Sequence, residues 1–451
     1  MHASLSTRDA AAPPRISNPD LDHARDVVAA LFGGPADRTF TVRYWDNSEE
    51  TPGFDSDTPF TLWFKRPGAL RRMLLPPSEL AIAEAFIDDD VDIEGDAEYA
   101  MHLGDVIGSR LKSLTRIASF LPMLQRLPHD DDKTQRELEA LRFAGGVRRR
   151  RGGSEAIRHH YDVGNDFYKL WLDDEMVYSC AYFTSETESL ESAQRAKLDL
   201  ICRKLRLAPG QKMLDIGCGW GALIMHAATN YGVDATGITV SEAQAQLARE
   251  RIENAGLSAR CRVELVDYRD FNPSARYDRI SSIGMMEHVG PARLSGYFEW
   301  AYQLMEPRGV FLNHTIVRDG HRGPENAVEK IEAKLWRRDE FIHRYIFPDG
   351  RLMAVSEVAN AAERAGFELR DLENLREHYV LTLRQWKRRL DASKDVAVKL
   401  VGERRYRTWR LYLLAATAGF RRGNTGIVQL VLSKPDESGV SGMPLTRSYM
   451  L

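Results

Sequence analysis

A glycine-rich loop is the segment of this chain whose residue types and spacing suit chemistry most clearly. The apolar run Met213–Ile216 leads directly into Gly217, Gly219 and Gly221, and a helical pattern begins at Ala222. Glycines at such a junction let the backbone turn tightly and come close to a ligand, and the helix start offers free N–H groups. The G-x-G-x-G spacing differs from the G-x-G-x-x-G fingerprint of dinucleotide sites. Taken alone, the loop predicts either a ligand site or a tight strand-to-helix turn.

Polar side chains also follow the next two expected strands. Thr239 and Gln244 lie at and after the end of the second strand, and the segment Asp267–Phe271 follows the third. The carboxyl ends of strands in a doubly wound parallel sheet converge on one crevice, so we expect these groups to lie together there. Hydroxyl, amide and carboxylate groups in one crevice suit a nucleoside better than a bare phosphate. The sequence therefore predicts a nucleoside-containing ligand.

The elements that must position these residues form two units of different type. From about residue 154 onward, short apolar runs alternate with helical stretches, which is typical of βαβ units and a parallel sheet. The runs are 213–216, 234–239, 262–266, 277–283 and 309–313. The first unit has strands expected at 38–45 and 59–65 and helices at 68–75, 77–87 and 97–124. The predicted fold class is α/β, a doubly wound sheet with a smaller N-terminal α+β domain.

Changes in composition divide the chain into five segments. We expect a flexible N-terminal tail, the α+β domain, a polar and basic linker, the catalytic α/β domain and a flexible C-terminal tail. Their expected bounds are 1–19, 20–128, 129–153, 154–435 and 436–451. The tails are rich in small and polar residues or in Pro and Gly, which is why they are expected to be loose.

The composition excludes several classes of protein. With 43% apolar and 28% charged residues among 451, the chain is neither disordered throughout nor fibrous. A net charge of −3 argues against a dedicated nucleic-acid binder. None of the four cysteines is spaced as C-x-x-C, so we expect no metal site and no disulfide framework, and a cytoplasmic protein. No run reaches the ~20 apolar residues of a membrane span, and Leu411–Phe420 is expected to be a buried helix.

Six motifs follow one another along the chain: His160–Tyr168, Tyr178–Phe183, L-D-I-G-C-G-W-G from Leu214, G-I-T-V-S-x-x-Q from Gly237, V-D-Y-R-D-F from Val266 and Ile283–Gly290. Together they resemble the motifs of the cyclopropane-fatty-acyl-phospholipid synthases, which include the mycolic acid cyclopropane synthases and carry the class I S-adenosylmethionine methyltransferase fold. Ile342–Gly350 is similar as well. Most members of the wider superfamily carry an acid after the second strand, where this chain has Thr239 and Ser241.

The resemblance implies a binding site for S-adenosylmethionine. Carried over position by position, the cofactor residues are Tyr178, Ser179, Asp215, Gly217, Gly219, Thr239, Gln244, Asp267, Tyr268 and Arg269. Asp267 corresponds to the position at the adenine amino group. Asp215 either organises the glycine loop or touches the ligand.

The implied reaction adds a methylene from the cofactor across a cis double bond of a phospholipid acyl chain. Attack by the alkene leaves a carbocation, which aromatic faces stabilise without trapping it; Tyr161, Tyr178, Tyr182 and Trp220 are the aromatic residues in motif positions. A base must then remove a proton from the transferred methyl group. In this family the base is a bound bicarbonate, and the matching catalytic positions here are Cys180, Glu287, His314, Ile316 through its backbone, and Tyr379.

The substrate implied by the resemblance is an unsaturated phospholipid at a membrane surface. We expect a cytoplasmic enzyme peripherally associated with the inner face of the membrane, through the N-terminal domain and the Arg148–Arg151 run, whose positive charges anionic head groups would attract. The same run also fits a solvated linker. The resemblance further implies a homodimer.

Three other functions remain open. A related fatty-acyl methyltransferase would leave a methyl or methylene branch (10-methylene type) in place of the ring. A small-molecule N-methyltransferase would not need the bicarbonate residues. A non-catalytic lipid-binding protein would not need the glycine loop or Glu287.

Overall fold

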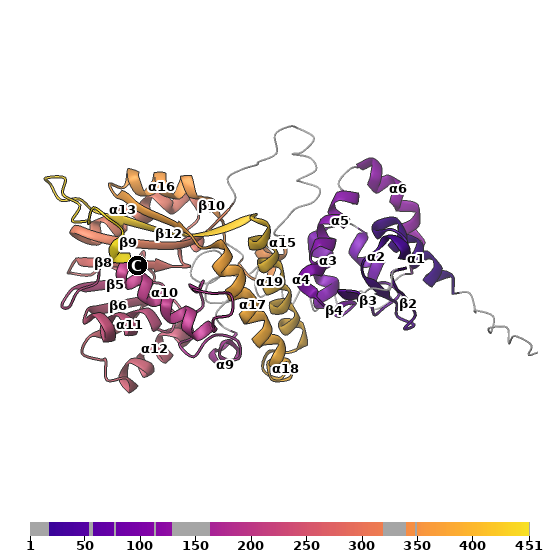
Figure 1. Ribbon diagram of the computed structural model, residues 1–451, viewed down its shortest axis with the longest axis horizontal. Helices are drawn as coiled ribbons and strands as arrows, with labels where there is room; N and C mark the ends of the chain where they lie inside the picture. Colours follow the sequence, from indigo (N-terminus) through magenta and orange to yellow (C-terminus); the bar gives the residue numbers. More distant parts are fainter. Residues whose placement is uncertain are drawn as a thin grey trace, which may run out of the picture.

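The computed structural model describes residues 18–53, 57–75, 78–111, 114–128, 163–318, 340–347 and 350–450. The Arg148–Arg151 run, Tyr161 and the linker expected at 129–153 lie outside these residues. The described residues form a large sheet with helices on both faces and a smaller N-terminal unit (Figure 1).

The large sheet carries the elements predicted from the second half of the sequence. Its strand order is β11-β12-β9-β8-β5-β6-β7, with β10 paired to β9. The strands are β5 Lys212–Ile216, β6 Asp234–Thr239, β7 Cys261–Leu265, β8 Tyr277–Ile283, β9 Met305–Arg318, β10 Met353–Ala354, β11 Glu368–Asn374 and β12 Thr425–Ser433. β7, β6, β5, β8 and β9 run parallel, and β12 is antiparallel to both β9 and β11. The chain leaves β5 toward β6 and later returns to its other side as β8, which creates a topological switch point beside β5.

Helices cover the two faces of this sheet because its strands are apolar on both sides. Met213 packs with helices α10 (Leu190–Lys204), α11 (Ala222–Tyr231) and α12 (Glu242–Asn254). The next residue, Leu214, packs on the opposite face with α13 (Leu294–Leu304) and α16 (Val355–Arg364). Successive side chains of a strand point to opposite faces, so an uninterrupted apolar run becomes a strand buried on both sides. The predicted α/β fold is confirmed.

The N-terminal unit is an α+β module, as predicted. Its sheet has the order β2-β1-β3-β4. The elements are α1 Pro19–Phe32, β1 Thr41–Arg43, β2 Glu49–Glu50, β3 Phe60–Phe64, α2 Ala69–Leu74, α3 Glu79–Ile87, β4 Val91–Gly95, α4 Ala97–Ala100, α5 His102–Leu111 and α6 Leu114–Gln125. The helical stretch expected over 97–124 is three helices. A single helix of that length would extend ~40 Å, whereas α5 and α6 fold back so that Leu103, Ile107 and Leu124 share one core.

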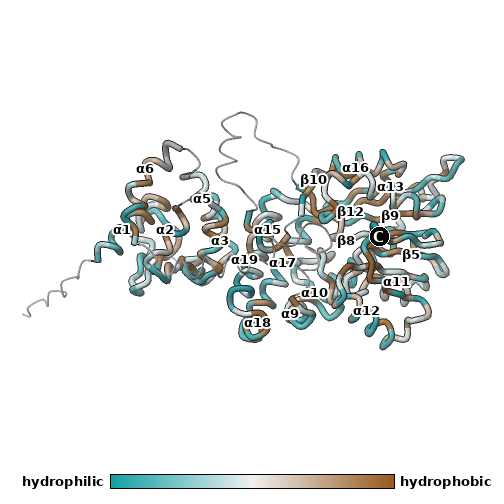
Figure 2. Tube along the Cα trace, turned by 180° about the vertical axis from the view of Figure 1, so that it is seen from behind, coloured by the Kyte–Doolittle hydropathy of each residue, from teal (hydrophilic) through white to brown (hydrophobic). Residues whose placement is uncertain are grey.

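The N-terminal unit docks on a helical layer of the catalytic part. This layer contains α9 Asn165–Lys169, α15 Glu340–Tyr345, α17 Arg376–Ala392, α18 Lys394–Val401 and α19 Glu403–Arg422, the last of which includes the helix expected at 411–420. Phe86 and Ile87 of α3 belong to the same buried cluster as α17 and α19. Figures 1 and 2 both show the hydrophobic helix α3 beside α15 and α19. The apolar side of α3 is therefore buried against the catalytic part.

The C-terminal segment from Asp436 packs against the catalytic part, although its composition predicts a loose tail. Met450 is only 9% exposed and lies in the core beneath α10. Arg447 Nε donates to Asp371 Oδ1 at 2.6 Å, and Arg308 Nε donates to Asp436 Oδ2 at 2.6 Å. Small and polar residues predict looseness locally, but these long-range contacts, which local composition does not report, hold the segment in place.

Candidate active site

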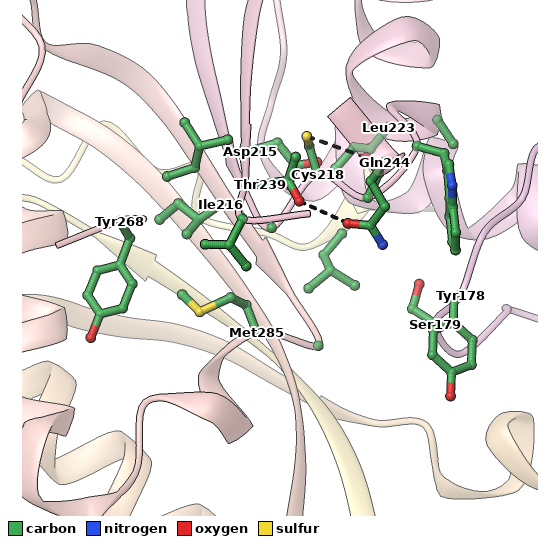
Figure 3. A pocket seen from close by; sticks show the side chains of 18 of the residues that line it. Tyr178, Ser179, Asp215, Ile216, Cys218, Leu223, Thr239, Gln244, Tyr268 and Met285 are labelled. Atoms are coloured by element: carbon green, nitrogen blue, oxygen red, sulfur yellow. Dashed lines mark hydrogen bonds between the residues drawn. The ribbon is translucent and has the colours of Figure 1, made fainter. Parts of the chain in front are cut away.

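One pocket opens at the carboxyl ends of β5, β6 and β7. Its empty space, open mouth included, is about 1180 Å³. In Figure 3, Tyr268 lies on one side of the pocket and Tyr178 with Ser179 on the other. The walls include all ten residues that the resemblance implies for cofactor binding: Tyr178, Ser179, Asp215, Gly217, Gly219, Thr239, Gln244, Asp267, Tyr268 and Arg269. The structure thus brings this whole set together, while the cofactor role of each residue stays a prediction.

The glycine loop after β5 is folded tightly against β6. Gly217, Gly219 and Gly221 have φ angles of 82°, 55° and 85°, in the left-handed region that other residues rarely adopt. The N–H groups of Gly217 and Cys218 both donate to the carbonyl oxygen of Ile238, at 2.9 and 3.0 Å. The glycines are therefore required by the path of the backbone, which wraps around the ligand space at the start of α11.

The end of β6 supplies a hydroxyl and an amide in one fixed arrangement. Thr239 Oγ1 donates to Gln244 Oε1 at 2.9 Å, and both side chains are buried (Figure 3). Ser241 caps α12, because its hydroxyl oxygen accepts from the backbone N–H of Gln244. The bond to Thr239 occupies the amide oxygen of Gln244 and leaves its NH₂ group to donate to a ligand. Such a pair suits the hydroxyls of a ribose.

The end of β7 carries an acidic group held by an arginine. Asp267 Oδ1 accepts from Arg269 Nε at 2.8 Å, and its Oδ2 accepts from Arg269 Nη2 at 2.6 Å. The ring of Tyr268 packs edge-on against Tyr297 and Trp300, each with 5.4 Å between ring centroids. The bidentate ion pair fixes the direction of the Asp267 carboxylate at the pocket wall. A carboxylate beside aromatic rings suits the amino group and the flat face of an adenine.

Asp215 lies under the glycine loop and is 3% exposed. Its Oδ1 accepts from the hydroxyl of Ser281 on β8 at 2.6 Å. Burial raises the pKa of Asp215 to about 6, against the opposing effects of this hydrogen bond and of the Lys197 charge. The sequence left open whether Asp215 organises the loop or touches a ligand, and the structure ties it to β8 while it lines the pocket.

A second group of polar residues lies beyond β8, at the strand pair β9–β12. The backbone N–H of Ile316 donates to Glu287 Oε1 at 2.6 Å. Glu287 Oε2 is buried and has no partner among the described residues. Burial raises the pKa of Glu287 to about 7, although the hydrogen bond from Ile316 acts in the opposite direction. Glu287 can therefore carry a proton near neutral pH and donate it in a hydrogen bond from Oε2.

His314 is oriented by two further side chains. Lys204 Nζ, which can only donate, lies 2.8 Å from Gln429 Oε1. The amide nitrogen of Gln429 therefore faces His314 Nδ1, 3.2 Å away, and donates to it. Burial and the charges of Lys197 and Lys204 lower the pKa of His314 far below its usual value, so the ring is neutral. Its single proton lies on Nε2, which is buried and has no partner in the described part of the chain.

Cys180 and Tyr379 are tied to the same strand pair through backbone contacts. Cys180 Sγ lies 3.7 Å from the carbonyl oxygen of Leu375, which also accepts from the N–H of Tyr379 at 3.0 Å. Leu375 in turn donates to Ile427 of β12, which pairs with Ile316 in the sheet. Burial raises the pKa of the Cys180 thiol, so it stays protonated at neutral pH. A thiol in this state is a poor nucleophile.

The aromatic residues in the motifs have different surroundings. Tyr178 and Trp220 both pack on Tyr168, with centroid separations of 5.5 and 5.1 Å, inside the buried aromatic cluster beside the pocket. Tyr182 stacks instead on His378 at 4.7 Å and is half-buried. Tyr178 and Trp220 are thus the pair that both lines the pocket and belongs to this cluster.

Reasoning from the sequence missed polar residues of the site, among them Lys197 and Gln429. Lys197 lines the pocket, and Gln429 orients His314. Each had a signal, because Lys197 falls on the apolar face of its helix and Gln429 interrupts the apolar run of β12. Charged or amide side chains in such positions are rarely buried without a partner or a function.

The described residues hold no candidate metal site and no candidate membrane span. No group of three or more His, Cys, Asp or Glu side chains within them could hold a metal ion. No helix within them is long and apolar enough to cross a membrane. All four cysteines, Cys180, Cys202, Cys218 and Cys261, are buried and free.

The sheet order, the switch point beside β5 and the pocket over the glycine loop define the fold of the class I S-adenosylmethionine-dependent methyltransferases. The family model for mycolic acid cyclopropane synthetase matches residues 148–430, and residues 27–113 match a domain of unknown function. The chain belongs to the mycolic acid cyclopropane synthetase family.

Two curated proteins and one crystal structure illustrate this relationship. The probable fatty acid methyltransferase of Pseudomonas putida is 34% identical over 411 residues, which cover 91% of this chain and 95% of that protein. The cyclopropane-fatty-acyl-phospholipid synthase of Escherichia coli K12 is 39% identical over 283 residues, covering 63% and 69%. The mycolic acid cyclopropane synthase CmaA1, crystallised with SAH and CTAB, is 35% identical with a TM-score of 0.58, covering 62% and 98%.

Proposed function

We propose that this protein binds S-adenosylmethionine in the pocket and transfers its methyl group to the double bond of an unsaturated fatty acyl chain. The observation that carries the proposal is the gathering of ten cofactor-type residues in one pocket at the switch point of the sheet. The SAH in the CmaA1 crystal structure supports the choice of cofactor. When bound, the cofactor supplies a methyl group on a sulfonium that leaves as a neutral thioether.

The product that we favour is a methylene-branched acyl chain. Two relatives that align along more than 90% of the chain are probable fatty acid methyltransferases, whereas the cyclopropane synthase of E. coli aligns over 63% of it. Methyl transfer to one alkene carbon leaves a cation on the other. A hydride shift followed by loss of one proton from the new methyl group gives an exocyclic methylene, and this sequence balances without a reductant.

The residues around Glu287 and His314 fit the capture of a small anion for the proton removal. Glu287 Oε2 and His314 Nε2 are both buried and unpartnered within the described residues. One is a carboxyl oxygen that can be protonated near pH 7, and the other carries the proton of a neutral imidazole. Two buried donors of this kind would hold bicarbonate, which would supply the base. Cys180 and the Tyr379 segment would complete the wall of this site.

Cyclopropane formation is the second candidate. It requires the same methyl transfer and the loss of the same methyl proton, but the ring closes before the hydride shifts. The 39% identity to the E. coli enzyme over 283 residues favours this outcome. The two products have the same mass, because each gains one CH₂.

Labelling of lipids tests both candidates. The protein is incubated with unsaturated phospholipid vesicles and methyl-labelled S-adenosylmethionine, and the acyl chains are analysed by mass before and after hydrogenation. A labelled product that takes up hydrogen is a methylene branch, and one that resists hydrogenation is a ring. Absence of label in lipid would contradict both. The control is the Gly217→Val variant, whose side chain is incompatible with the φ of 82° in the loop and which is expected to transfer no label.

We also propose that the enzyme acts from the cytoplasmic surface of the membrane. A phospholipid acyl chain lies in a bilayer, and the Arg148–Arg151 run would attract anionic head groups. Replacement of these arginines by serine is expected to weaken sedimentation with anionic vesicles, while unchanged sedimentation would contradict this role. The Arg262→Ser/Arg276→Ser variant, which removes two exposed positive charges from the catalytic domain, is the control and should sediment as the wild type does.

A further inference from the structure

Lys197 is a buried lysine in the wall of the cofactor pocket. It lies on α10, is 1% exposed, and lines the pocket together with Ser179 and Asp215. Its ammonium donates to the hydroxyl oxygen of Ser179 at 2.7 Å. Neither the methyl transfer nor the removal of the proton uses this charge.

Within the described part of the chain, the charge of Lys197 has no carboxylate partner. Lys204, seven residues later on the same helix and equally buried, forms an ion pair with Glu373. Among the described residues, no carboxylate oxygen lies within 4.0 Å of Lys197 Nζ. The two nearby acids are engaged elsewhere, because Asp173 accepts from the N–H of Val177 at 2.8 Å and Asp215 accepts from Ser281.

A buried ammonium without a counter-ion is costly, and proteins retain such groups where a ligand supplies the missing charge. At Lys197 the ligand would have to be an anion that enters the pocket. Ser179 Oγ accepts from Lys197, so its own proton remains available to a ligand. The ammonium and this hydroxyl, 2.7 Å apart, form two adjacent donors that match the two oxygens of one carboxylate.

The position of Lys197 in the pocket indicates which part of the cofactor would contact it. Tyr268, beside the acid suited to the adenine, lies on the far side of the pocket from Ser179, and the Thr239–Gln244 pair lies between them (Figure 3). A nucleoside laid along these groups directs its amino-acid moiety toward Ser179 and Lys197. Of the charged groups in that moiety, the sulfonium and the ammonium would be repelled by a lysine, and the carboxylate would be attracted.

We propose that Lys197, together with Ser179, binds the carboxylate of the amino-acid moiety of S-adenosylmethionine. The proposal rests on the proposed function in one respect, that the pocket takes this cofactor. Burial lowers the pKa of Lys197 to about 8, against the charges of Asp173, Cys180 and Asp215. The side chain is therefore mostly an ammonium at pH 7 and loses its charge in mildly alkaline solution.

Calorimetric titration of the full chain with two probes tests this role without lipid. S-adenosylhomocysteine carries the carboxylate, and 5′-methylthioadenosine lacks the whole amino-acid moiety. Lys197→Met is expected to weaken binding of S-adenosylhomocysteine at least about tenfold, the effect of a lost charged hydrogen bond. Binding of 5′-methylthioadenosine is expected to change less than about twofold. Lys204→Met is the matched control, a buried lysine outside the pocket lining, and should leave the ratio of the two affinities unchanged.

Two results would overturn the proposal: Lys197→Met lowers the affinity for both probes equally, or it lowers the affinity for neither. If that variant does not fold, the wild type is titrated at pH 6.5 and 8.5, and the preference for S-adenosylhomocysteine over 5′-methylthioadenosine must fall at the higher pH. A constant preference would refute the role of the ammonium. Failure of the wild type to bind either probe would contradict the cofactor assignment itself. This outcome differs from those that contradict only the role of Lys197.

Discussion

The amide nitrogen of Gln429 donates to Nδ1 of His314 over 3.2 Å, and Lys204 sets the direction of this hydrogen bond by occupying the amide oxygen at 2.8 Å. Gln429 pairs with His314 across β12 and β9, so the sheet itself places the two side chains next to each other. As a result, the only proton of the neutral ring is on Nε2, where it can be donated to a bound anion. The identity of a residue on a neighbouring strand thus fixes the tautomer of a proposed catalytic histidine.

Reversal of the hydrogen bond between Gln429 and His314 should remove the proton that His314 Nε2 donates. In Gln429→Glu a carboxylate replaces the amide and accepts a hydrogen bond from Nδ1–H, so that Nε2 carries no proton and can only accept. We expect product formation from unsaturated vesicles to fall at least about tenfold, as for loss of one positioned donor, while affinity for S-adenosylhomocysteine is retained. Lys204→Met removes the group that holds the Gln429 amide in one orientation but leaves the amide itself. Product formation should therefore fall less than in Gln429→Glu. Full activity of Gln429→Glu would contradict the tautomer assignment.

Glu287 should make the stability of the protein depend on pH. Its folded-state pKa of about 7 lies above the unfolded value of ~4.3, so the folded state holds the proton more tightly. Stability is then greatest below the unfolded pKa and decreases as the pH rises toward 7. Glu287→Gln lacks this decrease, and its advantage over the wild type should grow by on the order of 2 kcal/mol between pH 5 and 8. Thermal unfolding across this range measures it, and an advantage independent of pH would show that Glu287 is not buried with a raised pKa.

Arg407 should hold the N-terminal unit on the catalytic part. Its guanidinium donates to the carbonyl oxygens of Phe86 and Val91, at 2.6 and 2.9 Å, and to Asp92 at 3.1 Å. Arg407→Met leaves these buried acceptors without a donor, a change that costs roughly 3 to 5 kcal/mol. We expect faster hydrogen exchange in α3 and β4 than in the wild type. The exposed Arg421, which lies 3.5 Å from Glu98, is the control, and Arg421→Met should leave exchange unchanged.

Gly237 should be essential for the shape of the glycine loop. A Cβ at this position in β6 would lie 2.7 Å from both Cβ and Sγ of Cys218. Gly237→Ala is therefore expected to destabilise the fold by about 1 to 3 kcal/mol and to weaken binding of S-adenosylhomocysteine. Gly296, inside α13, has nothing within 4 Å of the corresponding position, so Gly296→Ala should stabilise by about 0.4 to 1 kcal/mol. Denaturant unfolding of both variants checks the contrast, and similar effects would contradict it.

Much of the catalytic domain can be read from the order of residues along the chain. The apolar runs ending at Ile216, Thr239 and Ile283 become parallel strands at the predicted places, because a strand buried on both faces has to be apolar throughout. The glycine loop is recognisable because its turn needs positive φ angles. The N-terminal unit was less readable. The spacing of apolar residues over 97–124 is helical. The residues at which one helix ends and the next begins depend on the core against which the helices pack.

The sequence by itself predicted the fold class from local periodicity, and the resemblance of its motifs implied the ten residues that surround the pocket. Only the tertiary structure decided how the remaining charges are used. It pairs Lys204 with Glu373, whereas Lys197 meets no carboxylate among the described residues, although both lysines lie on the buried face of one helix. It also packs the C-terminal segment against the core. The reason is physical: the partner of a buried charge comes from a distant part of the chain, and the spacing of residues along the sequence does not show which distant residues lie close together in the fold.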